Sequence, residues 1–310
     1  MQLIISLLFL VIGFAMLVKG ADWFVDGAAG LAARFGIPQL VIGLTIVAMG
    51  TSAPEAAVSI TAAMSGNAGI TIGNVVGSNI LNVLLILGVT AVIVAVPVQK
   101  STIRWEMPFM HGITIVLALL GMSGNVIGRG EGVILWALFL VYLGYLFRMA
   151  KNGNAEEEEI EQVPLWKQLL MLAVGIVLIV AGSDLTVDHA TVIAKIFGVS
   201  DRIIGLTIIA FGTSLPELVT SVTAARKGKA DIAIGNIVGS NIFNILFVVG
   251  TTALITPVEF KAGFVIDCAV ALVAGLILWF GVMKDKKLKK PVGVLMLLVY
   301  AVYFGYLFVG

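Results

Sequence analysis

The sequence is poor in charge, in cysteine and in histidine. Only 12% of its 310 residues are Asp, Glu, Lys or Arg, and the formal net charge is +1. A balance so close to neutral gives no strong field and argues against a nucleic-acid partner. The single cysteine, Cys268, excludes an intrachain disulfide, and the two histidines are far apart in the chain. We therefore expect neither a disulfide scaffold nor a zinc centre, and no cofactor.

Apolar residues make up 60% of the chain, and the mean hydropathy is +1.10. A soluble domain of this length is far less apolar, so the composition predicts a membrane protein whose solvent is the lipid bilayer. Crossing a bilayer takes about 20 mostly apolar residues. The chain offers ten such runs, which predict an all-α protein with ten transmembrane helices: roughly 3–20, 37–64, 69–97, 107–123, 131–149, 166–183, 199–225, 231–256, 262–282 and 292–309. The first run has no basic residue before it and is expected to be a retained helix rather than a signal peptide.

The chain repeats itself. Residues 36–88 align with 198–250 without a gap, at an offset of 162, and about 30 of the 53 aligned positions are identical. Such self-similarity predicts a duplicated architecture. We expect one five-helix repeat over 1–150, an acidic cytoplasmic linker over 151–165 and a second five-helix repeat over 166–310. The linker holds five glutamates and is expected to be a solvated loop; a regulatory cation site there is the alternative.

Because five is odd, the second repeat must enter the membrane from the opposite side. Lys and Arg favour cytoplasmic loops, and the loops after the first, third, fifth, seventh and ninth expected helices hold about 15 of the 19 basic residues. Both termini are therefore expected outside the cytoplasm, in a cell (cytoplasmic) membrane. The aligned corners 64–67 and 226–229 agree with inversion, since the first is uncharged and the second reads Arg-Lys-Gly-Lys.

Each repeat carries a glutamate inside an apolar run, in Gly50-Thr-Ser-Ala-Pro-Glu55 and in Gly212-Thr-Ser-Leu-Pro-Glu217. An ionisable residue at membrane depth is costly and indicates a functional site. Neither glutamate has a Lys or Arg nearby in its segment, so a simple ion pair is not the explanation. Proline removes a backbone donor and disrupts the preceding turn. We therefore expect the second and seventh helices to be discontinuous, as irregular backbone at membrane depth lines a cavity.

A second polar cluster follows each glutamate, in Gly73-Asn-Val-Val-Gly-Ser-Asn-Ile-Leu-Asn82 and in Gly235-Asn-Ile-Val-Gly-Ser-Asn-Ile-Phe-Asn244. Ser78 and Asn82 share one helix face, as do Ser240 and Asn244. These glycine-rich runs predict that the third and eighth helices are also discontinuous. Asn79 and Asn241 have a different expected role, as hydrogen bonds between helices. Carboxylate, hydroxyl and amide oxygens suit Na⁺ and Ca²⁺.

The paired Gly-Thr-Ser-x-Pro-Glu and Gly-Asn-x-x-Gly-Ser-Asn-Ile segments resemble the repeats of the calcium/cation antiporter superfamily, with prokaryotic sodium/calcium exchangers the most similar. The resemblance covers essentially the whole chain and implies exchange of Ca²⁺ for Na⁺ by alternating access, with the first and sixth helices sliding as a gate. It implies a calcium site of Glu55, Glu217, Thr51 and Thr213, with Asn82 and Asn244 completing the middle of the ion cluster. It also implies two sodium positions, one with Ala48, Ser52 and Ser78 and one with Ala210, Ser214 and Ser240, where the alanines act through backbone carbonyls.

One position departs from part of that family. Potassium-dependent members have Asp where this chain has Asn244, so only two carboxylates are expected at the centre. Exchange of Ca²⁺ for H⁺ and K⁺-dependent exchange of Na⁺ for Ca²⁺ stay open as alternatives. A membrane-embedded hydrolase lacks a nucleophile, a metal-binding His or a phosphate-binding Arg near either glutamate, so an enzyme is not expected. A passive channel fits an inverted repeat with broken helices less well than alternating access.

Overall fold

The computed structural model describes residues 2–152, 163–198, 208 and 210–309, and these are almost entirely helical. The expected linker and the start of the seventh expected helix lie largely outside the described residues. The elements of the first repeat follow in chain order: α1 (Gln2–Phe35), α2 (Gln39–Ile42), η1 (Gly43–Val47), α3 (Ala48–Thr51), α4 (Ala53–Met64), η2 (Ala68–Ile70), α5 (Thr71–Leu81), η3 (Asn82–Leu87), α6 (Gly88–Ile93), β1 (Val96–Pro97), η4 (Thr102–Glu106), α7 (Met107–Gly124), β2 (Val126–Ile127) and α8 (Arg129–Asn152).

The described part of the second repeat follows the same order, except that the residues aligned with η2 and η4 belong to α-helices: α9 (Leu165–Ile196), α11 (Ala210–Gly212), α12 (Leu215–Arg226), α13 (Ala230–Phe243), η6 (Asn244–Val249), α14 (Gly250–Ile255), β3 (Val258–Glu259), α15 (Gly263–Met283), β4 (Lys287–Leu288) and α16 (Lys290–Val309). Segments η1, η3, η4 and η6 are π-helical turns, and η2 is a 3₁₀ turn.

The expected helical membrane protein is confirmed in its coarse form. Eight helices among the described residues are long and apolar enough to cross a membrane, and a ninth span is formed if the bent pair of residues 39–51 and 53–64 is counted as one. The remaining expected span, the seventh (199–225), is described only at residue 208 and from residue 210 onward. Its described part consists of α11 and α12, which are separated at Ser214 as α3 and α4 are separated at Ser52.

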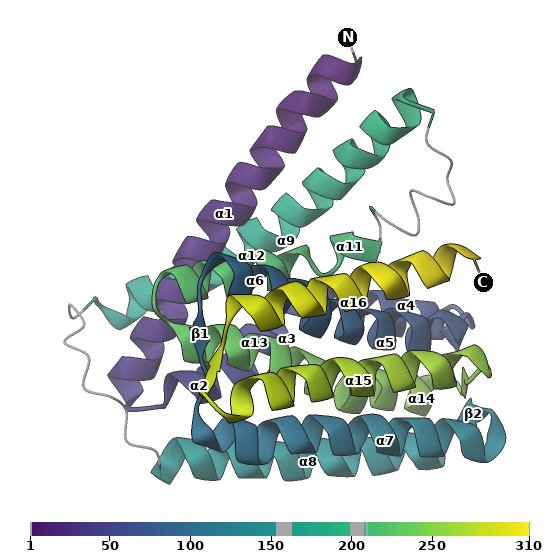
Figure 1. The fold of residues 1–310 in the computed structure, drawn as a ribbon. Coiled ribbons are helices and arrows are strands. Elements are labelled where there is room, and N and C mark those ends of the chain that lie inside the picture. The colour runs from purple at the N-terminus through teal and green to yellow at the C-terminus, as the bar shows by residue number, and fades with distance from the viewer. Residues whose placement is uncertain (1, 153–162, 199–207, 209, 310) are drawn as a thin grey trace.

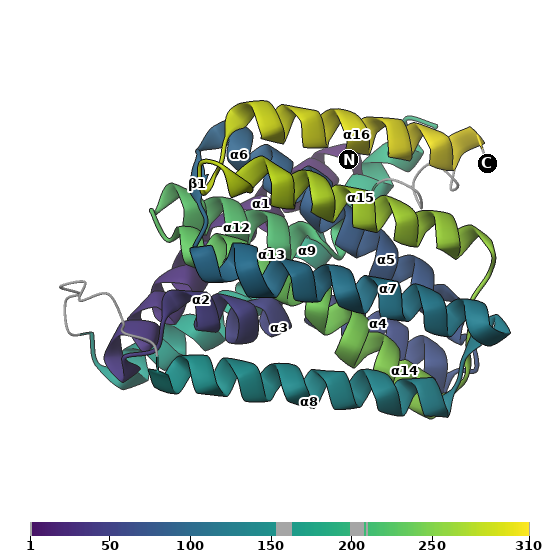
Figure 2. The same cartoon turned by 60° about the horizontal axis from the view of Figure 1, so that its bottom comes forward.

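The apolar core lies around the polar motifs rather than away from them. Every residue of α13 from Ile232 to Phe243 is buried, and most of α5 is buried as well. Figure 2 shows α16 and α8 at opposite sides of the molecule, with α4, α5, α12 and α13 between them. Helices α7, α8, α15 and α16 carry many of the exposed large apolar side chains, as expected of a surface that faces lipid.

Helices α1 and α9 lie side by side along much of their length and project from the rest of the molecule (Figure 1). They pack through glycines seven residues apart. A Cβ atom at Gly13 would meet the backbone of Gly182 at 3.0 Å, and one at Gly20 would meet that of Gly175 at 2.8 Å. The contact moves toward lower numbers on α9 as it moves toward higher numbers on α1, so the two helices are antiparallel. Equivalent helices that run in opposite directions are what an inverted repeat requires.

Two short strand pairs connect loops of the two repeats. Strand β1 pairs antiparallel with β4, and β2 pairs antiparallel with β3. The first pair joins the loops after the third and ninth expected helices, and the second joins those after the fourth and eighth. Lys227 adds a contact by ion pairs to Asp22 and Asp26 of α1 at 3.2 and 2.8 Å. Each contact joins loops that the inverted topology places on one membrane face.

The predicted discontinuities are found in the second helix but not in the third and eighth. α3 and α4 meet at Ser52 with a bend of 49°. Residues 68–93 and 230–255, by contrast, each form one uninterrupted helical span. The reason is that these two spans contain no proline, so every backbone N–H remains available. Instead of breaking, each span changes from α to π winding at the asparagine that ends its polar cluster, Asn82 or Asn244.

The close approach of α1 and α9 generates a stability prediction. We expect Gly20→Ala to lower the free energy of unfolding by about 1–3 kcal/mol, because the new methyl group would sit 2.8 Å from the carbonyl oxygen of Gly175. Gly144→Ala in α8 is the matched control, since no atom lies within 4 Å of its added Cβ. Denaturant unfolding in detergent micelles measures both. Equal stability of the two variants would contradict the packing described.

Candidate cation-binding site

The two glutamates are placed by the helix breaks. Ser52 precedes α4 with φ −85° and ψ 9°, and Ser214 precedes α12 with φ −93° and ψ 2°. A proline follows each serine in the first turn of the new helix, where its missing N–H would be unpaired in any case. Glu55 and Glu217 therefore project from the first turns of α4 and α12, where the helix dipole favours negative charge. Both are completely buried.

The serines at the breaks do not cap their own helices; they reach the other repeat. The Ser52 hydroxyl donates to Oε1 of Glu217 at 2.7 Å, and the Ser214 hydroxyl donates to Oε1 of Glu55 at 3.4 Å. Neither makes a side-chain capping hydrogen bond. Each carboxylate is thus bound by the break of the opposite repeat, and the two carboxylates interact electrostatically with each other. The duplicated motifs form one site.

The third helix of each repeat adds a second hydroxyl. Ser78 of α5 donates to Oε1 of Glu55 at 3.4 Å, and Ser240 of α13 donates to Oε1 of Glu217 at 3.5 Å. Ser240 also donates to the carbonyl oxygen of Ala48 at 3.4 Å.

These hydrogen bonds group the serines differently from the expected sodium positions, which themselves stay a prediction. Ser240 lies with Ala48 and Ser52, and Ser78 lies with Ser214. The physical reason is that each broken helix packs against the third helix of the other repeat as well as its own: η1 and α3 contact α13. The order of residues along one chain does not reveal this interdigitation.

Two asparagines that were not on the expected ligand list hold the glutamate helices in place. Asn74 donates to the backbone carbonyl of Glu55 at 3.2 Å and to the Ser59 hydroxyl at 2.9 Å. Asn236 repeats the pattern in the second repeat. It donates to the backbone carbonyl of Glu217 at 3.4 Å and to the hydroxyl of Ser221 at 2.9 Å. The signal available in the sequence was the recurrence of Asn74 and Asn236 one turn before each serine.

Thr51 extends this scaffold between the repeats. Its hydroxyl donates to Oδ1 of Asn236 at 2.9 Å and lies 3.3 Å from the carbonyl oxygen of Ala48. The hydroxyl is therefore directed at the asparagine that orients the second glutamate helix. Thr213, its counterpart, is only half-buried, and the side chain of Ala210 lies outside the described part of the structure.

Four asparagines form a closed network where α5 and α13 meet. Asn79 and Asn241 exchange hydrogen bonds, each amide donating to the backbone carbonyl of the other at 3.1 and 3.2 Å. Asn82 donates to Oδ1 of Asn241 at 3.0 Å, and Asn244 donates to Oδ1 of Asn79 at 3.1 Å. Asn79 and Asn241 thus connect helices, as expected. The network also fixes the amide orientation of Asn82 and Asn244, because their nitrogen atoms are engaged.

The arrangement leaves four buried acceptor atoms without a hydrogen-bond partner: Glu55 Oε2, Glu217 Oε2, Asn82 Oδ1 and Asn244 Oδ1. Each of the four side chains is at most 1% exposed. Leaving a buried acceptor unpaired costs about 1–3 kcal/mol, and more when the group is charged. Four such atoms, related in pairs by the repeat, are not explained by packing. Unpaired oxygen atoms of this kind are candidate ligands for a cation.

The donor set defines which cations fit. Among the described residues, no three His, Cys, Asp or Glu side chains lie together as a metal-binding group. The site instead combines two carboxylates with neutral amide, hydroxyl and backbone oxygens. Hard cations such as Ca²⁺ and Na⁺ are bound by such oxygen sets, whereas zinc and copper favour imidazole and thiolate ligands.

Comparison with known proteins agrees with this chemistry. A family model described as "Sodium/calcium exchanger protein" matches residues 5–148 and 167–309, which are the two repeats. The inner membrane protein YrbG of Escherichia coli is 36% identical over 285 residues, covering 87% of each chain. The sodium/calcium exchanger MaX1 of Methanosarcina acetivorans is 31% identical over 347 residues, covering 98% of this chain and 99% of its own.

A solved structure shows the same fold. The sodium-calcium exchanger NCX_Mj, soaked with zero Na⁺ and Ca²⁺, aligns with a TM-score of 0.86 at 32% identity, covering 98% of this chain and 99% of that chain. The match extends over both repeats and includes the two motifs that contain Glu55 and Glu217. The chain belongs to the sodium/calcium exchanger protein family.

Proposed function

We propose that this protein is a secondary active transporter that exchanges Ca²⁺ for Na⁺ across a membrane, and that both ions use the site between Glu55 and Glu217. The observation that carries the proposal is the set of four buried oxygen atoms without partners, contributed equally by the two repeats. Two of them are carboxylate oxygens that no basic side chain neutralises among the described ion pairs.

Charge explains how the two ions would be coupled. Two carboxylates balance one Ca²⁺ or two Na⁺, and a third Na⁺ would leave an excess positive charge. In a buried site of low effective dielectric, charge imbalance is strongly unfavourable. Ca²⁺ and a full set of Na⁺ therefore exclude each other, because both need Glu55 and Glu217. Because of this competition, one kind of ion can bind the site and be transported only after the other has been released.

The inverted symmetry supports alternating access. Two repeats of opposite direction contribute matching halves of one site, the arrangement found in transporters that open alternately to either side. Helices α1 and α9 pack closely through glycines and project together from the rest of the molecule (Figure 1). Each contacts the other far more extensively than it contacts any other helix, so the two can move as one unit. We infer that this pair is the moving gate, in keeping with the family resemblance.

Orientation follows from the basic residues. The loops that hold Lys100, Lys284–Lys290 and Lys227 are connected by the β1–β4 pair and by the ion pairs of Lys227 with α1. A face so rich in Lys is expected to be cytoplasmic. We infer a cytoplasmic-membrane protein with both termini on the opposite face.

Removing either carboxylate charge is the direct test of the site. We expect Glu55→Gln and Glu217→Gln each to reduce Ca²⁺ transport by at least about 100-fold, since the loss of one charged ligand in a buried site costs roughly 3 kcal/mol or more. Uptake of ⁴⁵Ca²⁺ into proteoliposomes measures it. Glu259→Gln is the control, because that side chain is exposed and lies outside the site. Wild-type uptake by either site variant would overturn the proposal.

Because Asn244 is neutral, the site has only two carboxylates, and replacing Asn244 with Asp tests the effect of a third. Asn244→Asp adds a charge beside the two glutamates and loses the amide that donates to Asn79. We expect it to change the dependence of transport on Na⁺ and K⁺ more than it changes stability, because the added charge alters how many positive charges the site balances. Flux assays over Na⁺ and K⁺ concentration measure this, with Asn67→Asp on an exposed turn as control. Identical ion dependence in both variants would show that position 244 does not set the ion balance.

A further inference from the structure

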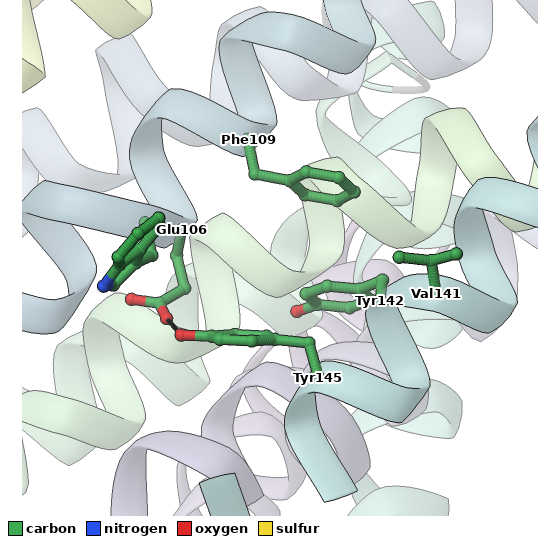
Figure 3. Close-up of a pocket in the computed structure, with 6 residues that line it drawn as sticks. Glu106, Phe109, Val141, Tyr142 and Tyr145 are labelled. Carbon is green, nitrogen blue, oxygen red and sulfur yellow. Dashed lines mark hydrogen bonds between the residues drawn. The ribbon is translucent and has the colours of Figure 1, made fainter. Parts of the chain in front are cut away.

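A pocket separate from the glutamate pair lies between η4–α7 and α8. Its volume is about 210 Å³, and six residues line it: Trp105, Glu106, Phe109, Val141, Tyr142 and Tyr145. Figure 3 shows Glu106 projecting from one helix toward Tyr145 on the other, with Phe109 and Tyr142 beside them. None of these residues takes part in the proposed exchange.

Glu106 is buried and only half-satisfied. Its side chain is 1% exposed, and Oε1 accepts a hydrogen bond from the Tyr145 hydroxyl. Oε2 has no partner, and neither has the buried hydroxyl of Thr102 one helical turn earlier. No ion pair to Glu106 occurs among the described residues. An acidic group with a free acceptor oxygen inside a pocket calls for a ligand that is positively charged and donates hydrogen bonds.

The walls of the pocket narrow the class of ligand. Four of the six lining residues are aromatic, and the rings of Phe109 and Tyr142 stack with centroids 5.6 Å apart. Aromatic faces attract organic cations, and a cage of such faces with a carboxylate is suited to an alkylammonium group. A small inorganic cation would find only one carboxylate and two hydroxyls here, fewer oxygens than it prefers. The chemistry fits an organic ammonium.

The position of the pocket indicates where that ammonium comes from. Glu106 is four residues into the span that begins at Thr102, roughly 6 Å along a helix, which is close to the headgroup layer of a bilayer. Trp105 and Val141 are 57% and 66% exposed, on the lipid-facing side of their helices. The Arg104 guanidinium lies 5.5 Å from the Trp105 ring and marks the rim with a positive charge. A positive rim beside a negative interior matches a zwitterionic lipid headgroup.

We propose that this pocket binds the headgroup of phosphatidylethanolamine, with the primary ammonium at Glu106 and the phosphate at Arg104. The ammonium N–H groups would donate to Oε2 of Glu106, which a quaternary choline group has no hydrogen to do. The acyl chains would lie along the exposed surface of α7 and α8. Phosphatidylglycerol, which carries no ammonium, is excluded from the acidic interior.

The second repeat provides an internal control. At an offset of 161, its corresponding pocket has Ile266, Val270 and Tyr303 in place of Trp105, Phe109 and Tyr142, while Asp267, at the position of Glu106, is not among its lining residues. An acid and a tyrosine recur, and Tyr303 donates to Asp267 at 2.9 Å. The tryptophan and phenylalanine walls do not recur. The proposal therefore assigns the lipid to the first repeat alone.

Native mass spectrometry of the delipidated full chain in detergent tests this, with phosphatidylethanolamine, phosphatidylcholine and phosphatidylglycerol of equal acyl length. We expect the wild type to retain phosphatidylethanolamine above the other two, and Glu106→Gln to weaken that retention roughly tenfold, since one charge-assisted hydrogen bond is worth about that much. Trp105→Ile, which installs the residue of the second repeat at an exposed position, should also weaken it. Asp267→Asn should leave it unchanged.

Three results would overturn the assignment. The first is equal retention of the three lipids by the wild type. The second is unchanged selectivity in both Glu106→Gln and Trp105→Ile, the latter guarding against misfolding of the buried variant. The third is displacement of the lipid by soluble ethanolamine at a similar concentration, which would assign the pocket to a free amine. Selective retention that both pocket variants lose and Asp267→Asn keeps would support the lipid site.

Discussion

Two carboxylates buried beside each other, with no basic side chain to neutralise them, are the constraint on which this structure depends. The side chains of Glu55 and Glu217 are both buried, and two buried like charges are costly to ionise together unless positive charge compensates them. The surrounding side chains do little to reduce this cost, since one oxygen of each carboxylate is left unpaired. In the proposed mechanism a transported cation supplies the missing positive charge. Hydrogen bonds from the surrounding helices, rather than basic side chains, hold the two carboxylates in place.

That scaffold is built from helix breaks and amides. The breaks at Ser52 and Ser214 turn each serine hydroxyl toward the opposite repeat, while Asn74 and Asn236 hold the glutamate backbone from the side. The network around Asn79 and Asn241 engages the nitrogen atoms of Asn82 and Asn244, the proposed ligands, and leaves their oxygen atoms without hydrogen bonds. Because each of these links recurs at the equivalent positions of the other repeat, the site is nearly symmetric although the chain runs through it in opposite directions.

Sequence alone predicted the features that cost free energy in a membrane. A helical membrane protein with inverted repeats could be predicted from the buried glutamates, the prolines beside them and the recurrence of both motifs. Asn79 and Asn241 connect helices, as expected. The third and eighth helices were predicted wrongly as broken, because glycine without proline is accommodated by π winding. The hydrogen-bonded neighbours of Ser78 and Ser240 also differ from the expected grouping, since they depend on how α13 packs against the first repeat. The scaffold role of Asn74 likewise depends on a contact that residue spacing does not encode.

The central claim is that Na⁺ and Ca²⁺ compete for one two-glutamate site and are thereby exchanged. Its most direct test is ⁴⁵Ca²⁺ flux in proteoliposomes of the purified wild type, with Na⁺, K⁺ and H⁺ gradients imposed one at a time. The account predicts that an outward Na⁺ gradient drives Ca²⁺ uptake, and that K⁺ or H⁺ gradients alone do not. Uptake that ignores the Na⁺ gradient, or that a pH gradient drives without Na⁺, would contradict it.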